Sequence, residues 1–223
     1  MAKRKLLSFA ENESFPHFFQ PRYHEIKDGF SLKSAWNESY FKNDGPITLE
    51  LGCGKAEFSY YLAGKYPERN FVGIDLKGAR LWRGAKDSFE NKMNNIAFIR
   101  SHVQNVNHFF GPQEVEEIWI PFPDPQLHKP GERKRLTSSG FLKRYADVLK
   151  PDHIIHLKTD NRPFFEYTLE TIASGGHQLL FSTFDLYNEN VDYDAVKVQT
   201  FYEKQFLDQG MEIKYLQFRL NNA

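Results

Sequence analysis

The residues after an apolar run at 116–123 have types suited to orienting and stabilising a reacting group. Asp124 lies between Pro123 and Pro125 in the stretch IPFPDPQLHKPGERKRL, residues 120–136. Each proline fixes its own φ and restricts the residue before it, so the Asp124 carboxylate is carried on a stiff turn. Such a preorganised carboxylate suits a catalytic or substrate-orienting role, because little reorganisation is needed as charge develops. The alternative is a solvated acid in a proline-rich bend.

A basic segment follows this turn. The whole chain carries 29 basic and 29 acidic residues, but seven basic and only two acidic residues fall between Lys129 and Lys150. A protein that coats nucleic acid without preference is usually basic overall, so a nucleic-acid role here depends on local clustering. A solvated helix face would give the same pattern. The basic residues placed to contact RNA phosphates are Arg133, Lys134, Arg135, Lys143 and Arg144.

Two glycines near the first apolar run could bring the backbone close to a ligand. In LELGCGKAEF, residues 49–58, Gly52 and Gly54 stand where an apolar run gives way to a helical pattern. Amide N–H groups in such a turn can face a bound molecule. Glu50 lies at the end of the run, and Asp75 ends the next one, where an acid can accept both ribose hydroxyls. A tight turn with an incidental downstream acid is the alternative.

The residue at the place of the third glycine argues against binding of a dinucleotide. A Gly-x-Gly-x-x-Gly loop holds a pyrophosphate at a helix N-terminus, but Glu57 occupies the place of the third glycine. Carboxylates at Glu50 and Glu57 suit a ligand with positive charge, and S-adenosylmethionine carries a sulfonium and an ammonium group. The loop therefore favours methyl transfer over nicotinamide-dependent oxidoreduction.

Apolar runs that alternate with helical segments would position these residues. The first five runs start roughly 20 to 40 residues apart, which is the spacing of successive βα units. This predicts an α/β fold with a doubly wound, mostly parallel sheet and helices on both faces. Ligands bind beyond the carboxyl ends of the strands in such sheets. The five runs are 47–54, 70–76, 95–100, 116–123 and 153–160.

The two ends of the chain have other patterns. Segments 177–186 and 211–220 resemble two more strands with a short helix between them, which predicts an antiparallel edge strand near the C-terminus. Residues 1–45 show no sustained period and are interpreted as a partly irregular lead-in. Its basic residues at positions 3–5 could add a phosphate contact or form a solubilising tail. The domain with the methyltransferase features is expected at 46–223.

A set of motifs, taken in order between residues 47 and 206, resembles the bacterial tRNA (guanine-N7)-methyltransferases, which are class I methyltransferases. The resemblance implies an S-adenosylmethionine-dependent enzyme that methylates N7 of a guanine in the variable loop of tRNA. The motifs are LELGCGKAEF, GIDL, PFPDP followed by ERKRL, FLKRY, HLKTDN and TFYEKQF.

The resemblance also implies roles for individual residues. Asp124 would be the catalytic carboxylate. The cofactor would contact Glu50, Gly52, Cys53, Gly54, Asp75, His102 and Asp124. The guanosine would contact His128, Lys129, Asp160, Thr200, Tyr202 and Glu203, although Tyr202 could equally fill the core.

The chain departs from the family pattern at three places. His102, in SHVQN, stands where the family usually has an acid near the adenine. Ala56 stands where a glycine is often found. The segment 126–131 replaces a Trp-Pro-Lys-Lys-Arg-His pattern, so the substrate-contacting lysine of the family falls on His128 or on Lys129.

The chemistry of guanine N7 fits these residue types. N7 attacks with an in-plane lone pair, so no proton has to be removed and the ring becomes cationic. Carboxylates such as Asp124, Asp160 and Glu203 can stabilise that charge and accept hydrogen bonds from the guanine edge. The Asn-Pro-Pro-aromatic motif typical of exocyclic amine methylation is absent, and Cys53 in the cofactor loop is not placed to attack a pyrimidine.

The composition excludes several classes of protein. A single cysteine excludes an intramolecular disulfide and a Cys-rich metal site, and no run approaches the roughly 18 apolar residues that cross a bilayer. We therefore expect a cytoplasmic monomer or homodimer that needs neither a membrane nor a metal, and the resemblance implies tRNA as its partner. Two alternatives stay open: a class I methyltransferase acting on another acidic acceptor, and a non-catalytic RNA-binding protein with this fold.

Overall fold

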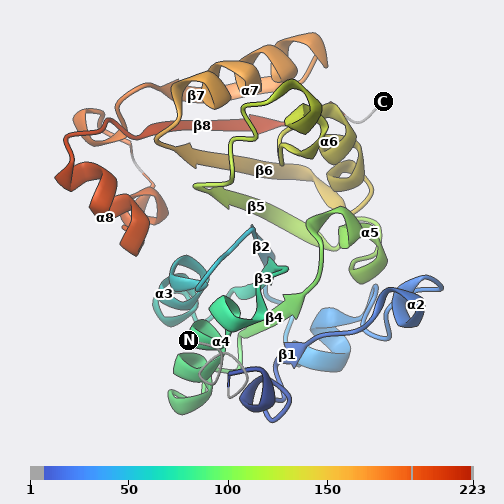
Figure 1. Cartoon of the computed structure of the whole chain (residues 1–223). Helices are drawn as coiled ribbons and strands as arrows, with labels where there is room; N and C mark the ends of the chain where they lie inside the picture. Colours follow the sequence, from blue (N-terminus) through green and yellow to red (C-terminus); the bar gives the residue numbers. More distant parts are fainter. Residues whose placement is uncertain (1–7, 192, 222–223) are drawn as a thin grey trace.

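Eight strands form one sheet through the protein, in the order β1-β4-β3-β2-β5-β6-β8-β7 (Figure 1). The computed structural model describes residues 8–191 and 193–221, so the basic positions 3–5 lie outside the described residues. The strands are β1 (Phe18–Phe19), β2 (Ile47–Leu51), β3 (Asn70–Asp75), β4 (Ile96–Arg100), β5 (Val115–Pro121), β6 (Leu149–Thr159), β7 (Gln178–Thr183) and β8 (Lys214–Arg219).

The pairing of these strands confirms the predicted α/β fold. All strand pairs from β1 through β6 are parallel, whereas β8 pairs antiparallel with both β6 and β7. The reversed strand is therefore β8, which lies between β6 and β7, and β7 forms the edge of the sheet. Every residue of β2 is buried, including the polar Thr48 and Glu50, because parallel strands are covered on both faces.

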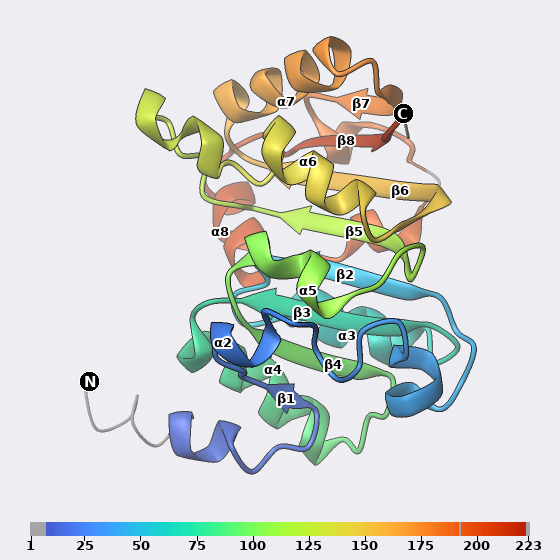
Figure 2. The same cartoon turned by 90° about the vertical axis from the view of Figure 1, so that its right-hand side faces the viewer.

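Helices cover both faces of the sheet. The helices α5 (Val106–Phe109) and α6 (Ser139–Ala146) lie on one face, and α3 (Glu57–Lys65) and α4 (Gly78–Glu90) lie on the other (Figures 1 and 2). The apolar core is accordingly divided into two clusters, one on each side. Further α-helices are α2 (Tyr23–Ile26), α7 (Arg162–Ser174) and α8 (Phe201–Asp208), and a π-helix spans Trp36–Phe41.

The described part of the lead-in is continuous with the rest of the core. Strand β1 extends the sheet by pairing in parallel with β4. Trp36 is fully buried, and its Nε1 donates a hydrogen bond to the carbonyl of Phe109 at 3.0 Å. Residues 8–45 therefore complete one edge and one face of the sheet.

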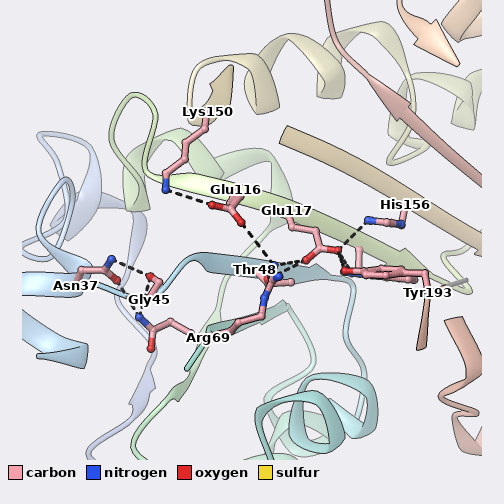
Figure 3. A network of polar contacts seen from close by, with 11 residues as sticks. Asn37, Gly45, Thr48, Arg69, Glu116, Glu117, Lys150, His156 and Tyr193 are labelled. Atoms are coloured by element: carbon pink, nitrogen blue, oxygen red, sulfur yellow. Dashed lines mark hydrogen bonds and ion pairs between the residues drawn. The ribbon is translucent and has the colours of Figure 1, made fainter. Parts of the chain in front are cut away.

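A polar network lies at the amino-terminal end of the central strands (Figure 3). The buried Glu117 carboxylate accepts hydrogen bonds from Arg69 at 2.6 Å and from Tyr193 at 2.5 Å, and His156 Nε2 lies 2.9 Å away. Burial alone would raise the pKa of Glu117, but His156, Arg69 and Tyr193 together lower it to about 2. Tyr193 thereby fastens the segment between β7 and α8 to the sheet.

Candidate active site at the carboxyl ends of the strands

A cavity of about 800 Å³ opens beyond the carboxyl ends of β2, β3, β4 and β5. A smaller hollow of about 90 Å³ adjoins it and shares Gly52, Arg80 and Phe122 with it. Ligands occupy this place in doubly wound sheets. Of the predicted site residues, the larger cavity is lined by Gly52, Asp75, His102, Asp124, Arg133, Lys134 and Arg144, and the smaller hollow by Glu50, Gly52, Cys53, Gly54, Thr200 and Tyr202.

The loop between β2 and α3 has a backbone that suits glycine. Gly52 and Gly54 have φ values of 72° and 57°. Ala56, where a glycine is often found in the family, also has a left-handed φ of 56°. A left-handed conformation costs an L-residue with a Cβ about 1 to 2 kcal/mol, so this alanine is strained. A Cβ added at Gly54 meets no atom within 4 Å, which leaves open space beside the loop.

Asp75 holds this loop to the end of β3. Its Oδ2 accepts a hydrogen bond from the Gly54 amide at 2.9 Å, and its Oδ1 accepts one from the Lys77 amide at 2.7 Å. The carboxylate is half-buried and lines the larger cavity. Its orientation is thus fixed by the backbone before any ligand arrives. His102 follows β4 as an exposed residue of the same cavity wall.

Glu50 is the most strongly perturbed acid at this end of the sheet. Its side chain is 2% exposed, and one oxygen accepts hydrogen bonds from the Ser59 amide and from the Ser59 hydroxyl. Burial, together with the nearby charges of Asp75 and Glu57, raises the pKa of Glu50 to about 8. Burial also raises the pKa of the Cys53 thiol, so it stays protonated and is a poor nucleophile.

We expect Glu50 to give stability and cofactor binding opposite pH dependences. Its pKa rises from 4.5 in the unfolded chain to about 8, so the folded state holds an extra proton between these values. The free energy of unfolding without ligand should therefore fall as pH rises through this window. Affinity for a cationic cofactor should rise over the same window, because the cation favours the ionised carboxylate.

Urea unfolding and calorimetric titration with S-adenosylmethionine across this pH window would measure both slopes. Glu50→Gln cannot ionise and should flatten both of them. Slopes that persist in this variant would assign the titration to another group.

The turn that carries Asp124 is stiffer than its prolines alone require. Phe122 and Gln126 both have left-handed φ values, 51° and 47°. Such a φ is unusual for an aromatic residue, and the Phe122 amide is held by the carbonyl of Lys158 at 2.8 Å. Asp124 is exposed, and its Oδ1 accepts a hydrogen bond from the Gln126 amide at 3.1 Å. The turn therefore fixes the direction in which this carboxylate points.

The five basic residues predicted to contact RNA phosphates lie in three different settings. Arg133, Lys134 and Arg144 line the larger cavity. Arg135 instead supports the turn: its Nε donates to the carbonyl of Pro125 at 3.1 Å, and its guanidinium lies over the Tyr167 ring at 4.1 Å. Lys143 is an exposed residue of α6, and it does not line the cavity.

Glu203 lies below the surface of the site. It is fully buried, and its Oε1 is 2.5 Å from Lys158 Nζ and 2.7 Å from the Tyr187 hydroxyl. Its Oε2 accepts a hydrogen bond from the Thr200 amide at 3.4 Å, and the Thr200 hydroxyl accepts one from the Glu203 amide at 3.3 Å. This capping box starts α8. His128, Lys129 and Asp160 are likewise not part of either cavity wall.

Two residues outside the predicted set either line the site or support it from below. Arg80, in the first turn of α4, lines both cavities, and only its position shortly after Asp75 hints at this. Lys158 is fully buried at the end of β6, and besides Glu203 it donates to the carbonyls of Val196 at 2.9 Å and Val198 at 3.2 Å. Burial lowers the pKa of Lys158, and Glu203 opposes that shift.

A second cavity, of about 610 Å³, lies at the opposite end of the sheet. Most of its charges are paired within the protein: Arg69 pairs with Glu117, and Lys150 lies 3.4 Å from Glu116 (Figure 3). It is therefore a weaker candidate for the active site. Among residues 8–191 and 193–221, no cluster of three His, Cys, Asp or Glu residues could hold a metal ion, and no helix is long and apolar enough to span a bilayer.

Comparison with solved structures agrees with this architecture. The 16S rRNA methyltransferase KamB has a TM-score of 0.64 at 15% identity, over 85% of this chain and 94% of that one. A variant of the 16S rRNA (adenine(1408)-N(1))-methyltransferase from Catenulisporales acidiphilia, solved with its cosubstrate SAM, has a TM-score of 0.58 at 16% identity, over 85% and 92% of the two chains. These similarities show the class I methyltransferase fold.

Comparison of sequences identifies the family. The profile of a family described as "Putative methyltransferase" matches residues 44–216. The tRNA (guanine-N(7)-)-methyltransferase of Christiangramia forsetii is 48% identical over 221 residues, 98% of this chain and 99% of that protein. The protein of the same name from Bacteroides thetaiotaomicron is 44% identical over 221 residues, 99% of this chain and 87% of that protein. The chain therefore belongs to the tRNA (guanine-N7)-methyltransferase family.

Proposed function

We propose that this protein transfers the methyl group of S-adenosylmethionine to N7 of a guanine in the variable loop of tRNA. The observation that carries the proposal is the larger cavity at the strand ends, around which Gly52 of the glycine loop, Asp124 and the basic side chains of Arg133, Lys134 and Arg144 lie together. S-adenosylmethionine supplies an electrophilic methyl group on its sulfonium. The remaining steps depend on groups of this chain.

The residues at the strand ends fit that cofactor. The cavity volume of about 800 Å³ lies within the usual range for ligand sites, and the space beside Gly54 is open. Asp75, already oriented by two backbone amides, can accept hydrogen bonds from ribose hydroxyls. Glu50 lines the smaller hollow, where an ionised carboxylate would attract the positive charge of the methionine part. His102 would lie beside the adenine.

Asp124 has the chemistry that the transfer step needs. The N7 lone pair forms the new bond to carbon as the carbon–sulfur bond breaks, so positive charge passes to the purine and no proton is taken from N7. A fixed carboxylate stabilises that developing charge without reorganising. Thr200 and Tyr202, which line the smaller hollow, would contact the guanosine. Glu203 would act indirectly, by holding the turn at Thr200.

The proposed reaction agrees with the expected setting of the protein. Transfer from a sulfonium to a free lone pair requires no metal and no membrane. Since the substrate class is tRNA, we place the protein in the cytoplasm. Each chain holds its own complete cavity, so a monomer would suffice and a homodimer is compatible with it.

A labelling experiment tests this function. The protein is incubated with methyl-labelled S-adenosylmethionine and an unmodified tRNA transcript, and the RNA is digested to nucleosides. Label should appear in 7-methylguanosine, and a transcript without guanine in its variable loop should stay unlabelled. Label in another nucleoside would overturn the base assignment. Label in protein but not RNA would favour another acceptor, and cofactor binding without any transfer would favour a non-catalytic RNA-binding protein.

We expect tRNA affinity to fall steeply with salt, because the basic cavity wall contacts phosphates. Arg133→Gln and Lys134→Gln should each reduce the slope of log K against log salt by about 1. Lys92→Gln is the matched control, because this exposed lysine precedes β4 at the opposite end of the sheet. Fluorescence anisotropy with labelled tRNA at several salt concentrations measures the slopes. Equal slopes in all variants would remove these residues from the RNA contact.

A further inference from the structure

The start of α8 is hydrogen-bonded to the cofactor loop. The Phe201 amide donates to Glu57 Oε2 at 2.7 Å, although the two residues are 144 positions apart in the sequence. Phe201 is the first residue of α8, whose leading N–H groups have no partner within the helix. Glu57 is the first residue of α3 and directly follows the loop of residues 52–56. One carboxylate thus joins the beginnings of two helices.

Lys55 strengthens this junction. Its Nζ lies 3.7 Å from Glu57 Oε1 and 4.3 Å from the centre of the Phe201 ring. A carboxylate next to a helix N-terminus and a cation above an aromatic ring are both favourable contacts. The left-handed Ala56 precedes Glu57 and sets the direction in which α3 begins. Both oxygens of Glu57 are therefore engaged by the protein.

The junction lies where the two halves of the proposed site meet. Thr200 and Tyr202, on either side of Phe201, line the smaller hollow together with Gly52, Cys53 and Gly54. A ligand that orders the glycine loop would act on Glu57 at its end, and Glu57 would pass the effect to the turn at Thr200. Contact between two such elements provides a physical basis for coupling between their ligands.

We infer that Glu57 is a positioning residue that couples the cofactor site to the guanosine site. This inference rests on the proposed function. Bound cofactor restrains the glycine loop further, and the existing contact of Glu57 with the Phe201 amide passes this restraint to the start of α8, so that Thr200 and Tyr202 are held for the guanosine. Coupling is reciprocal, so tRNA should also strengthen cofactor binding by the same factor. The buried pair of Lys158 and Glu203 anchors α8 separately, so loss of Glu57 should leave the helix folded.

The test measures binding without chemistry. S-adenosylhomocysteine, the demethylated product, replaces the cofactor, and the dissociation constant of tRNA is measured with and without it. In the unchanged protein the product should tighten tRNA binding at least about fivefold. Glu57→Ala should bring this ratio close to one. Glu57→Gln retains an oxygen for the Phe201 amide and should restore much of it. Glu68→Ala, an exposed acid beyond the other end of α3, should keep the full ratio.

Two results would overturn the inference. They are no coupling in the unchanged protein and full coupling in folded Glu57→Ala. If product affinity fell in that variant while the ratio stayed unchanged, Glu57 would be a direct ligand contact instead. Circular dichroism confirms that each variant is folded. Formation of 7-methylguanosine by the unchanged protein is read separately, so the coupling can fail while the proposed function stands, and the reverse is equally visible.

Discussion

Asp124→Asn should lower kcat for tRNA methylation about 100-fold or more, which is the usual cost of removing one preorganised electrostatic contact. The asparagine oxygen can still accept the hydrogen bond from the Gln126 amide, so the turn should keep its shape. What disappears is the negative charge facing a purine that becomes cationic. Because that charge matters most in the transition state, kcat should fall much more than KM rises.

Single-turnover measurement with saturating cofactor and tRNA gives the rate of the transfer step in Asp124→Asn without a contribution from KM. Asp152→Asn is the control, because Asp152 is an exposed acid of the opposite cavity and should leave kcat unchanged. If Asp124→Asn lost less than about threefold in kcat, the charge would have no part in the transfer step.

Lys158→Met should destabilise the protein by about 3 to 5 kcal/mol, since removing one partner of a buried ion pair leaves the other charge uncompensated. Glu203 is fully buried, and the carbonyls of Val196 and Val198 would also lose their donor. Urea unfolding measures the loss. The segment before α8 should loosen as well, so hydrogen exchange there should accelerate.

A double variant shows whether the loss of stability comes from the Lys158–Glu203 ion pair or from the packing of the two side chains. Lys158→Met with Glu203→Leu removes both charges and should recover part of the stability lost by Lys158→Met alone. If the two losses simply added, the ion pair would not be the source of the effect. Tyr187, which donates to the same Glu203 oxygen, is left in place in both variants.

Much of the expected cofactor site could be predicted from local patterns of apolar residues in the sequence. Parallel strands buried on both faces appear as continuous apolar runs, so their ends, and with them Gly52, Asp75 and Asp124, could be located. Strand β1 was not predicted, because two residues are too short to show alternation. Only its parallel pairing with β4 identifies this segment as a strand.

The positions of the residues expected to bind the tRNA depend on contacts with residues that are distant in the sequence. Arg135 was grouped with the phosphate contacts, but whether a guanidinium reaches solvent or stacks on Tyr167 depends on packing between elements. Glu203 was assigned to the guanosine by resemblance. The spacing from Thr200 to Glu203 is also that of a capping box, which predicts that the glutamate folds back onto its own helix start. That signal was present in the sequence.

The placement of α8 has a consequence for how the acceptor can change. Strands β7 and β8 are neighbours in the sheet, yet the chain between them, residues 184–213, contains both Tyr193 and the turn at Thr200. This connection is an excursion whose described residues add no strand to the sheet, so changes at its exposed positions would not shift any strand register, whereas its buried residues, such as Leu186 and Val196, pack into the core. Grafting a different excursion onto the same cofactor half offers a modular route to new RNA targets, through which one fold can acquire several specificities.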